Sequence, residues 1–397
     1  MKEKSVFPAK LRKLLHNTFV KDRYLWRLIK ITLVVKLLIL LIVVFSYRLL
    51  PFCERCYKEN FIYPKNEEIS WISGFKTWDA QHYLYLAEKG YKQENQSSRF
   101  YPLYPLLIKT FSLVFDYSFL IIGLLLSNIF SAVAVVIFYL LVKKFYDKKT
   151  AFIAGMLLLA FPTAFYLSLV YTEALFLMLA VCFFYSFYTR KYLISIFLAF
   201  LIPLSRPQGL LVICAYVVFL LINFIRKGIK NTDFVSKVFI LLSFILGAGA
   251  YFLFLKYFTG SFFSIFEAHK NLKSGYSVSG IFDPAGWFLN NFILTKLTLH
   301  GFATSMIDRF SFFVYLLILF WAYKKIDLLL FCYLLFLGLF PAMTGLFTGY
   351  MRFLLVVFPI YIVLALKFKK EYLLIVVLMF GLQLIFLIMH SLNYWVA

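Results

Sequence analysis

Long apolar runs separated by short charged segments dominate this chain, and they are the feature that most restricts its possible folds. A helix needs roughly 17 to 25 apolar residues to cross about 30 Å of hydrocarbon. About eleven runs meet that requirement, and with 63% hydrophobic and 15% charged residues the chain lies outside the range of soluble domains. We therefore predict an all-α, polytopic membrane protein with about 11 transmembrane helices. The expected spans cover residues 31–50, 119–142, 151–169, 173–189, 191–205, 208–225, 238–258, 305–323, 326–342, 350–366 and 371–390.

The basic residues are concentrated in alternate connections. The chain has 41 Lys and Arg against 18 Asp and Glu, a net charge of +23. With the N-terminus in the cytoplasm, the cytoplasmic segments hold 24 of the basic residues and six of the acids. With an odd number of spans, this positive-inside pattern places the C-terminus outside. Anionic lipid, rather than nucleic acid, then accounts for the basicity. The cytoplasmic segments are residues 1–30, 143–149, 190–191, 226–237, 324–325 and 367–370, with the acids that adjoin them.

The connections on the two sides differ in length. Residues 1–30 form a basic cytoplasmic N-terminus, and the run that follows is too long for a signal peptide, so we expect a retained first span. Residues 31–258 form an N-terminal transmembrane module that contains a first outer loop, residues 51–118. A second outer loop, 259–304, precedes a C-terminal transmembrane module, 305–397. Since the cytoplasmic connections between spans are short, any chemistry is expected on the outer side.

A polar, reactive helix is predicted in the first outer loop. The stretch TWDAQHYLYLAEKGY, residues 77–91, has Thr77 as a candidate N-cap and Gly90 as a candidate stop. At 100° per residue, Asp79, His82 and Tyr83 share one face. Asp79 in the first turn is expected to be ionised, because the helix dipole favours a carboxylate there. The alternative is a surface helix on lipid headgroups that Asp79 merely caps.

Several segments together resemble a known family. WDAQHYLYLAEKGY (78–91) followed by FYPLYPLL (100–107) resembles the PIG-V-type mannosyltransferases, the GPI mannosyltransferase 2-like enzymes, and their prokaryotic relatives. FPTAFYLSLVYTEALF (161–176), LSRPQGLL (204–211), YFTGSFFSIFEAHK (257–270) and GYMRFLLVVFPIYIVLA (349–365) fit the same pattern in the same order. The 26 residues before Trp78, with Cys53 and Cys56, have no counterpart that we recognise.

The resemblance implies the GT-C glycosyltransferase architecture, with membrane-parallel helices in the first outer loop and an extracytoplasmic site. It also implies a polyprenyl-phosphate sugar donor, typically dolichyl-phosphate mannose, and inversion at the anomeric carbon. In such enzymes the acid after the Trp lies near the acceptor hydroxyl. Carried over to this sequence, that acid is Asp79.

Glycosyl transfer from a lipid phosphate needs a base, cations for the departing phosphate and shelter from water. We expect Asp79 to be the catalytic base and Arg352 and Arg206 to bind the donor phosphate, because a guanidinium stays charged and grips two phosphate oxygens. His82, His269 and Lys270 are further candidates for phosphate binding. The alternative for the basic residues is snorkelling to lipid headgroups, and for the two histidines an ordinary polar role in a loop.

The sugar and the acceptor need polar and aromatic partners. Glu173 begins a span, where a carboxylate is costly unless it faces a partner or a wet cavity, so it is a candidate for binding hydroxyls or orienting an Arg. Its alternative role is electrostatic stabilisation of a helix start. Trp78, Tyr83, Tyr101 and Tyr104 are candidate sugar or acceptor contacts, with interfacial anchoring as the alternative for the aromatic residues. Arg309 beside Asp308 is interpreted as a boundary pair.

No cofactor is predicted. The chain has no Asp-x-Asp motif of the kind that holds a divalent metal against a pyrophosphate, so we expect a metal-independent reaction. Cys53 and Cys56 are interpreted as a short disulfide or two free thiols rather than a zinc site, since no second Cys or His pair lies nearby. Asn95-Gln96-Ser97 is a glycosylation sequon, meaningful only in a eukaryotic host.

The sequence therefore predicts an inverting membrane glycosyltransferase that moves mannose, or a similar hexose, from a polyprenyl phosphate to a hydroxyl of a lipid-linked or surface glycan. Its expected partners are that donor, a glycan or glycolipid acceptor and membrane lipids, without nucleic acid. The expected location is the plasma membrane of a prokaryote, or the endoplasmic reticulum membrane of a eukaryote. The alternatives are a transporter or flippase of lipid-linked sugars, which would place its ionisable residues near the bilayer midplane, and an assembly protein without catalysis.

Overall fold

The computed structural model describes residues 22–92, 97, 100–227, 233–262 and 279–396. Within these ranges the chain is all-helical, without a named strand, and has one isolated bridge between Thr298 and Ser305. The first half contains α2 (Arg23–Leu49), α3 (Glu54–Lys58), η2 (Trp71–Phe75), α4 (Asp79–Lys89), α5 (Leu103–Phe115), α6 (Phe119–Phe145), α7 (Lys148–Ala160), η4 (Ala164–Leu167), α8 (Glu173–Tyr188), α9 (Tyr192–Leu201) and η5 (Ile202–Leu204). The second half contains α10 (Gln208–Lys227), α11 (Phe234–Thr259), α13 (Ser279–Phe282), α14 (Pro284–Phe288), η6 (Leu289–Leu294), α15 (Met306–Ala322), α16 (Leu328–Met343), α17 (Tyr350–Leu355), α18 (Pro359–Lys367) and α19 (Tyr372–Ser391).

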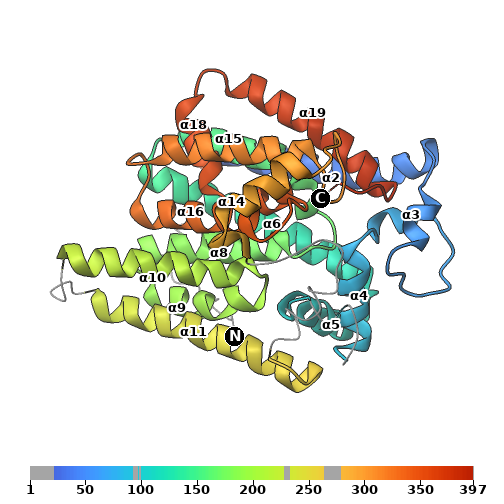
Figure 1. The fold of residues 1–397 in the computed structure, drawn as a ribbon, viewed down its shortest axis with the longest axis horizontal. Helices are drawn as coiled ribbons and strands as arrows, with labels where there is room; N and C mark the ends of the chain where they lie inside the picture. Colours follow the sequence, from blue (N-terminus) through green and yellow to red (C-terminus); the bar gives the residue numbers. More distant parts are fainter. Residues whose placement is uncertain (1–21, 93–96, 98–99, 228–232, 263–278, 397) are drawn as a thin grey trace, which may run out of the picture.

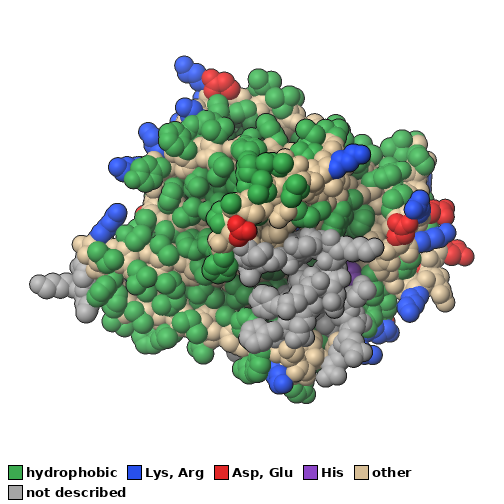
Figure 2. Space-filling model, viewed as in Figure 1, with side chains coloured by type: hydrophobic (Ala, Val, Ile, Leu, Met, Phe, Trp, Pro, Cys, Tyr) green, Lys and Arg blue, Asp and Glu red, His purple; other side chains and the backbone are tan. Residues whose placement is uncertain are grey.

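The long helices lie side by side in one bundle (Figure 1). Five helices of the described chain are long and apolar enough to cross a membrane, namely α2, α6, α10, α11 and α19. Large apolar side chains on them face outward, among them Leu33, Leu253 and Leu378 at 59%, 64% and 64% exposure. Figure 2 shows the same apolar covering on the face it displays. The all-helical membrane prediction is confirmed, whereas the count of eleven spans stays a prediction.

Two predicted spans are broken, and the interpretation of each as a continuous helix was wrong. The run 151–169 ends as a helix at Ala160, because Phe161 precedes Pro162 and takes an extended ψ of 138°. The run 350–366 is divided into α17 and α18, with Pro359 at the first position of the second helix. Irregular backbone inside a membrane bundle is tolerated where it is enclosed by protein or lines a cavity. The break after Ala160 carries Tyr166 and Tyr171 of the candidate site described below, and α17, which ends at the second break, carries Arg352.

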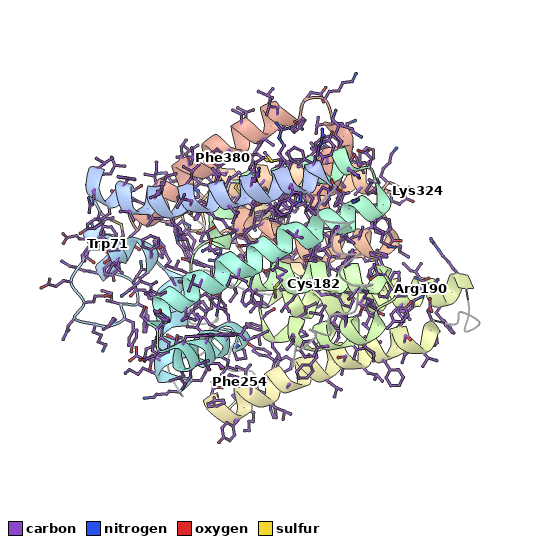
Figure 3. The ribbon with its side chains drawn as sticks, turned by 180° about the vertical axis from the view of Figure 1, so that it is seen from behind. Trp71, Cys182, Arg190, Phe254, Lys324 and Phe380 are labelled. Atoms are coloured by element: carbon purple, nitrogen blue, oxygen red, sulfur yellow. A yellow bond between two sulfur atoms is a disulfide. The ribbon has the colours of Figure 1, made fainter. Side chains whose placement is uncertain are left out.

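The two ends of the bundle differ in character. Helices α3, α4 and α5 gather at one end (Figure 1), and Trp71 marks that end in Figure 3, where Lys324 and Arg190 lie at the opposite end. The turns of this opposite end, which we call the basic end, are tied together by ion pairs. Lys369 Nζ lies 2.6 Å from an Asp147 oxygen, and this hydrogen bond holds the pKa of Asp147 below its usual value. The basic turns therefore form one face, as the charge pattern of the sequence requires.

A buried lysine links three parts of the bundle. Lys36 of α2 is 8% exposed, and its ammonium donates to Ser131 and Asn128 of α6 and to Ser168 in the break after α7. These partners are neutral oxygens, and Ser131 and Asn128 hydrogen-bond other groups as well. The cluster stabilises the position of the broken segment against α2 and α6.

Candidate active site

The turn before α4 places Asp79 and packs against the residues that follow α19. Trp78 has a φ of 51°, a left-handed conformation that costs a non-glycine residue about 1–3 kcal/mol and persists only where its surroundings enforce it. Its indole donates to the Tyr394 carbonyl at 3.3 Å and packs edge-on against Trp395. These contacts fix the backbone immediately before Asp79. Trp78, a predicted sugar contact, thus has a role in positioning Asp79.

Thr77 does not cap α4, so that prediction was wrong. Its hydroxyl lies 2.8 Å from Nε2 of His390, a buried residue of α19. Its carbonyl accepts a hydrogen bond of 2.8 Å from the Tyr171 hydroxyl. The predicted stop at Gly90, whose φ is 75°, is confirmed. Thr77 instead connects the start of the catalytic candidate helix to α19 and to the segment before α8.

Four charged residues predicted for the site come together in one cluster. Arg352 of α17 donates through Nη1 to Asp79 Oδ2 at 2.7 Å and through Nε to Glu173. Arg206, in the turn before α10, places Nη1 2.6 Å from Glu173 Oε1. The cluster therefore runs from Asp79 through Arg352 and Glu173 to Arg206. Residues from four separate parts of the sequence build it.

The four side chains of this cluster differ in solvent exposure. The side chain of Glu173 is fully buried, that of Arg206 is 6% exposed and that of Arg352 is 12% exposed. Asp79 is the most open member, at 30% exposure. Glu173 Oε2 and Arg206 Nε are buried without a hydrogen-bond partner. A buried polar atom without a partner costs roughly 1–3 kcal/mol, so these two atoms mark a place where a polar ligand would be stabilised.

Two tyrosines and a histidine that sequence reasoning missed surround Arg352. Its guanidinium carbon lies 4.7 Å from the ring centres of both Tyr166 and Tyr171, an attractive cation–π arrangement. The hydroxyls of these tyrosines lie 3.4 Å and 3.2 Å from the two ring nitrogens of His390. Both tyrosines stand inside the FPTAFYLSLVYTEALF segment, which was the available signal, whereas nothing in the sequence singled out His390.

The backbone on both sides of Arg352 is held by side chains from other elements. Asp308 Oδ1 accepts the Met351 N–H at 2.8 Å. Thr163 donates to the Met351 carbonyl at 3.3 Å, and Gln208 donates to the carbonyl of Phe353 at 3.1 Å. Because hydrogen bonds fix the peptide groups before and after Arg352, its guanidinium is directed at the two carboxylates.

Asp308 and Arg309, interpreted from the sequence as a boundary pair, both direct their side chains to backbone groups. Arg309 donates to the backbone carbonyls of Asn291, Ser305 and Ala303 at 2.6, 2.8 and 3.1 Å. It thereby fixes the connection before α15, while the Asp308 carboxylate serves α17.

His82 and Tyr83 belong to an aromatic layer beside the cluster. The His82 ring is stacked between Phe61 and Phe100, and its Nδ1 lies 2.8 Å from the Ser97 hydroxyl. Tyr83 is buried, with its hydroxyl 3.3 Å from that of Thr172, and burial raises its pKa. Since α4 is buried on several faces, it is not a surface helix resting on headgroups.

The remaining predicted contacts fall into two groups. Tyr101 is 5% exposed and stacked on Tyr251, and Tyr104 is fully buried and donates to the Gly123 carbonyl at 2.9 Å. Both rings are enclosed by protein in this structure. His269 and Lys270 lie outside the described residues.

Cys53 and Cys56 are joined as a disulfide in the turn at α3. Among the described residues, no group of three or more His, Cys, Asp or Glu side chains is arranged to hold a metal ion.

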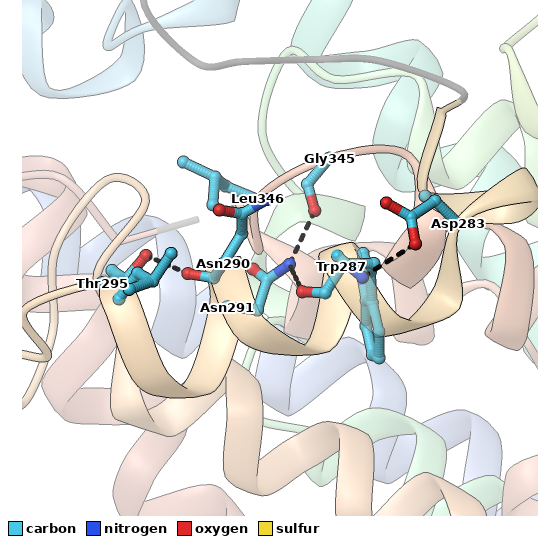
Figure 4. Close-up of a pocket in the computed structure, with 10 residues that line it drawn as sticks. Asp283, Trp287, Asn290, Asn291, Thr295, Gly345 and Leu346 are labelled. Carbon is cyan, nitrogen blue, oxygen red and sulfur yellow. Dashed lines mark hydrogen bonds between the residues drawn. The ribbon is translucent and has the colours of Figure 1, made fainter.

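A pocket of about 370 Å³ adjoins the segment that leads to Arg352 (Figure 4). Asp283, Asn290 and Thr295 supply polar groups to its wall. Asn291 closes the floor by donating to the Gly345 carbonyl at 3.0 Å and accepting from the Phe347 N–H. None of the four clustered charges lines this pocket, so its uncharged polar groups and single carboxylate suit hydroxyl groups better than a phosphate.

Comparison with known proteins gives a fold and no closer relative. No family model and no curated protein matches the chain. Among solved structures, the chain is similar to the oligosaccharyltransferase of Archaeoglobus fulgidus in its apo form, with a TM-score of 0.52 and 13% identity over 91% of this chain and 56% of that one. The same enzyme with an inhibitory peptide and a dolichol-phosphate gives a TM-score of 0.46 at 14% identity, over 90% of this chain and 56% of that one. This chain thus spans little more than half the length of that protein. The two share the GT-C fold, and the resemblance to the PIG-V-type family stays a prediction.

Proposed function

We propose that this protein is a membrane glycosyltransferase that moves a hexose, mannose by family resemblance, from a polyprenyl phosphate to a hydroxyl of a lipid-linked or surface glycan. The single observation that carries the proposal is the cluster in which Arg352 joins the half-open Asp79 to the buried Glu173 and Arg206. The archaeal neighbour is an oligosaccharyltransferase, and this shared fold supports the class by analogy only.

Asp79 is proposed as the general base. Its carboxylate is the most open group of the cluster and is positioned by the constrained turn at Trp78. As the acceptor oxygen attacks the anomeric carbon, Asp79 takes the hydroxyl proton. The bond between the anomeric carbon and the phosphate oxygen breaks, and its electron pair leaves with the polyprenyl phosphate. Attack opposite the leaving group inverts the anomeric centre.

Arg352 and Arg206 are proposed to bind the phosphate. Their guanidiniums can neutralise the charge that develops on the leaving group, so the proposed reaction needs no metal. Glu173 keeps the two cations close together despite their repulsion. When a phosphate binds, it offers Arg352 an alternative to Asp79, which frees that carboxylate to accept a proton. Tyr166 and Tyr171 keep Arg352 in place during the exchange.

The location of the site follows from the same proposal. The cluster lies toward the end that carries α4, opposite the basic end (Figure 1). If the basic end faces the cytoplasm, as the positive-inside rule expects, the site is extracytoplasmic. The pocket at Asn290 and Asp283 is the proposed place for acceptor hydroxyls.

The test is transfer by the purified full chain from a panel of radiolabelled polyprenyl-phosphate hexoses. We expect Asp79→Asn to lower turnover by about 10²–10⁴, the usual worth of a general base. Asp116→Asn, an exposed acid at the end of α5, is the matched control and should keep full activity. Equal turnover by the Asp79→Asn variant and the wild type would remove Asp79 from the mechanism. Movement of lipid-linked sugar across vesicles without transfer would favour the flippase alternative.

A further inference from the structure

A second pocket lies at the basic end, far from the cluster of four charges. It has a volume of about 360 Å³ and lies where the end of α8 meets the beginnings of α9, α11 and α16 and the end of α10. Arg190 marks this end in Figure 3, opposite the end that carries Trp71. The proposed transferase reaction gives this pocket no role.

Positive charge prevails in the pocket. Arg190, Arg226 and Lys237 line it, against one acid, Asp327. The Asp327 carboxylate is already engaged, since it accepts hydrogen bonds from the Tyr188 hydroxyl and the Leu329 N–H. An anion in the pocket would therefore meet three cations, with Asp233 beside Arg190 as the nearby competing acid.

The burial of Lys237 strengthens its attraction for an anion. Lys237 is only 9% exposed, so its charge acts through a medium of lower effective dielectric than water. Arg190 is more open, and its Nε lies 3.7 Å from Asp233, a long distance for an ion pair. The Arg190 guanidinium can thus turn toward a ligand at little cost.

The backbone of Arg190 is also unusual. Its φ is 58°, in the left-handed region where an L-residue pays roughly 1–2 kcal/mol and glycine is preferred. The turn is closed by the Lys191 N–H, which donates to the Ser186 carbonyl at 2.9 Å. A strained backbone conformation often marks a functional residue, and here the side chain of Arg190 lines the pocket.

Exposed apolar side chains stand close to the lining residues in the sequence. Leu193 of α9, Ile225 of α10 and Val235 of α11 are 84%, 80% and 63% exposed. Phe219 and Tyr192 contribute aromatic groups to the pocket wall, which also contains Asn223 and Leu328. A ligand that fits this surface combines an anionic head with hydrocarbon chains, whereas a free phosphate would use only the cations.

We propose that this pocket binds the headgroup of an anionic phospholipid from the leaflet that the basic end faces. Basic pockets between transmembrane helices are a known form of lipid recognition. Bound there, a phosphate would bridge the α8–α9 turn, the end of α10 and the first turn of α11. The lipid would thus link the ends of α8, α10 and α11 at the basic end.

The test is native mass spectrometry of the detergent-solubilised full chain titrated with phosphatidylglycerol and, separately, with phosphatidylcholine. The pocket variant is Arg190→Gln with Arg226→Gln, which leaves the buried Lys237 in place. The control is Lys149→Gln with Lys370→Gln, two exposed residues of the basic end outside the pocket. At about 1 kcal/mol for each basic residue near anionic lipid, the pocket variant should bind phosphatidylglycerol roughly 30-fold more weakly. The control should stay within about threefold of the wild type.

Three results would overturn the proposal. Equal weakening in both double variants would show general attraction between a basic surface and anionic lipid. Unchanged affinity in the pocket variant would show that the lipid binds elsewhere. Displacement of phosphatidylglycerol by millimolar inorganic phosphate would show a site for the free ion. Thermal unfolding of the lipid-free variants, expected to match the wild type, separates a loss of binding from a loss of folding.

Discussion

Removing the charge of Glu173 is expected to damage folding more than removing the charge of Asp79. Glu173 is fully buried and lies against Arg352 and Arg206, whose side chains are 12% and 6% exposed. In a Glu173→Gln variant both guanidiniums stay buried beside a neutral amide. Breaking a buried ion pair from one side typically costs about 3–5 kcal/mol. The expected loss for Glu173→Gln therefore lies in that range.

Asp79→Asn provides the comparison within the same cluster. The Asp79 side chain is 30% exposed, so solvent screens its attraction to Arg352. We expect this variant to lose about 1 kcal/mol or less of stability, as exposed ion pairs do. The main effect of Asp79→Asn should be a lower turnover. The two substitutions remove the same charge, but Glu173 is fully buried against two guanidiniums, whereas Asp79 is partly exposed and pairs with Arg352.

The assay is unfolding of the detergent-solubilised chain by added sodium dodecyl sulfate, followed by circular dichroism and tryptophan fluorescence. A double variant, Glu173→Gln with Arg206→Gln, should recover part of the loss, because it removes one of the stranded charges. The reasoning is refuted if Glu173→Gln is as stable as Asp79→Asn. It is also refuted if the losses of Glu173→Gln and of Arg206→Gln, each measured alone, simply add in the double variant.

Three further predictions concern other parts of the molecule. Asp308→Ala removes the acceptor of the Met351 N–H, and it should slow transfer by up to about 10²-fold because Arg352 is then misplaced. Asp308→Asn keeps an oxygen at that position and is the control. Hydrogen exchange of the 344–355 peptide should rise only in the alanine variant. Gly247→Ala should lower the unfolding midpoint, because a Cβ there would lie 2.2 Å from the Phe200 carbonyl oxygen, while Gly249→Ala on the same helix meets nothing within 4 Å and should not. The free energy of unfolding of Lys36→Met should equal that of the wild type to within about 1 kcal/mol, or exceed it, because the partners of this ammonium are neutral. A large loss of stability would show that the charge itself is needed.

Three charges of the site could be predicted from the sequence because each is costly in an apolar chain. Glu173, Arg206 and Arg352 lie at or next to predicted spans, where burial of a charge is tolerated only beside an opposite charge. Asp79 came instead from the family resemblance and from its place in the first turn of the predicted loop helix. Glu173 in particular needed a partner or a wet cavity once its span was placed, which made it a candidate for orienting an Arg. The partners could not be assigned from sequence, because the residues lie up to 273 positions apart.

Other features escaped sequence reasoning for equally physical reasons. With 21% aromatic residues, Tyr166 and Tyr171 do not stand out from Tyr101 and Tyr104, although the first two pack on Arg352 and the others fill the core. Hydropathy cannot tell a continuous span from one broken at Pro162, because the broken segment is just as apolar. Threonine is a common N-cap residue, but the hydroxyl of Thr77 is engaged by the buried His390 of α19.

The residues of the cluster are synthesised at different times. Arg352 is made 179 residues after Glu173 and 273 after Asp79, and at about 5–20 residues per second the longer interval lasts roughly 14–55 s. During that time Glu173 has Arg206, from the turn that follows the next helix, as its earlier neutralising neighbour. A nascent protein would thus insert its first helices with one carboxylate already compensated. The cluster of four charges would be complete only after α17, the helix that carries Arg352, has been synthesised.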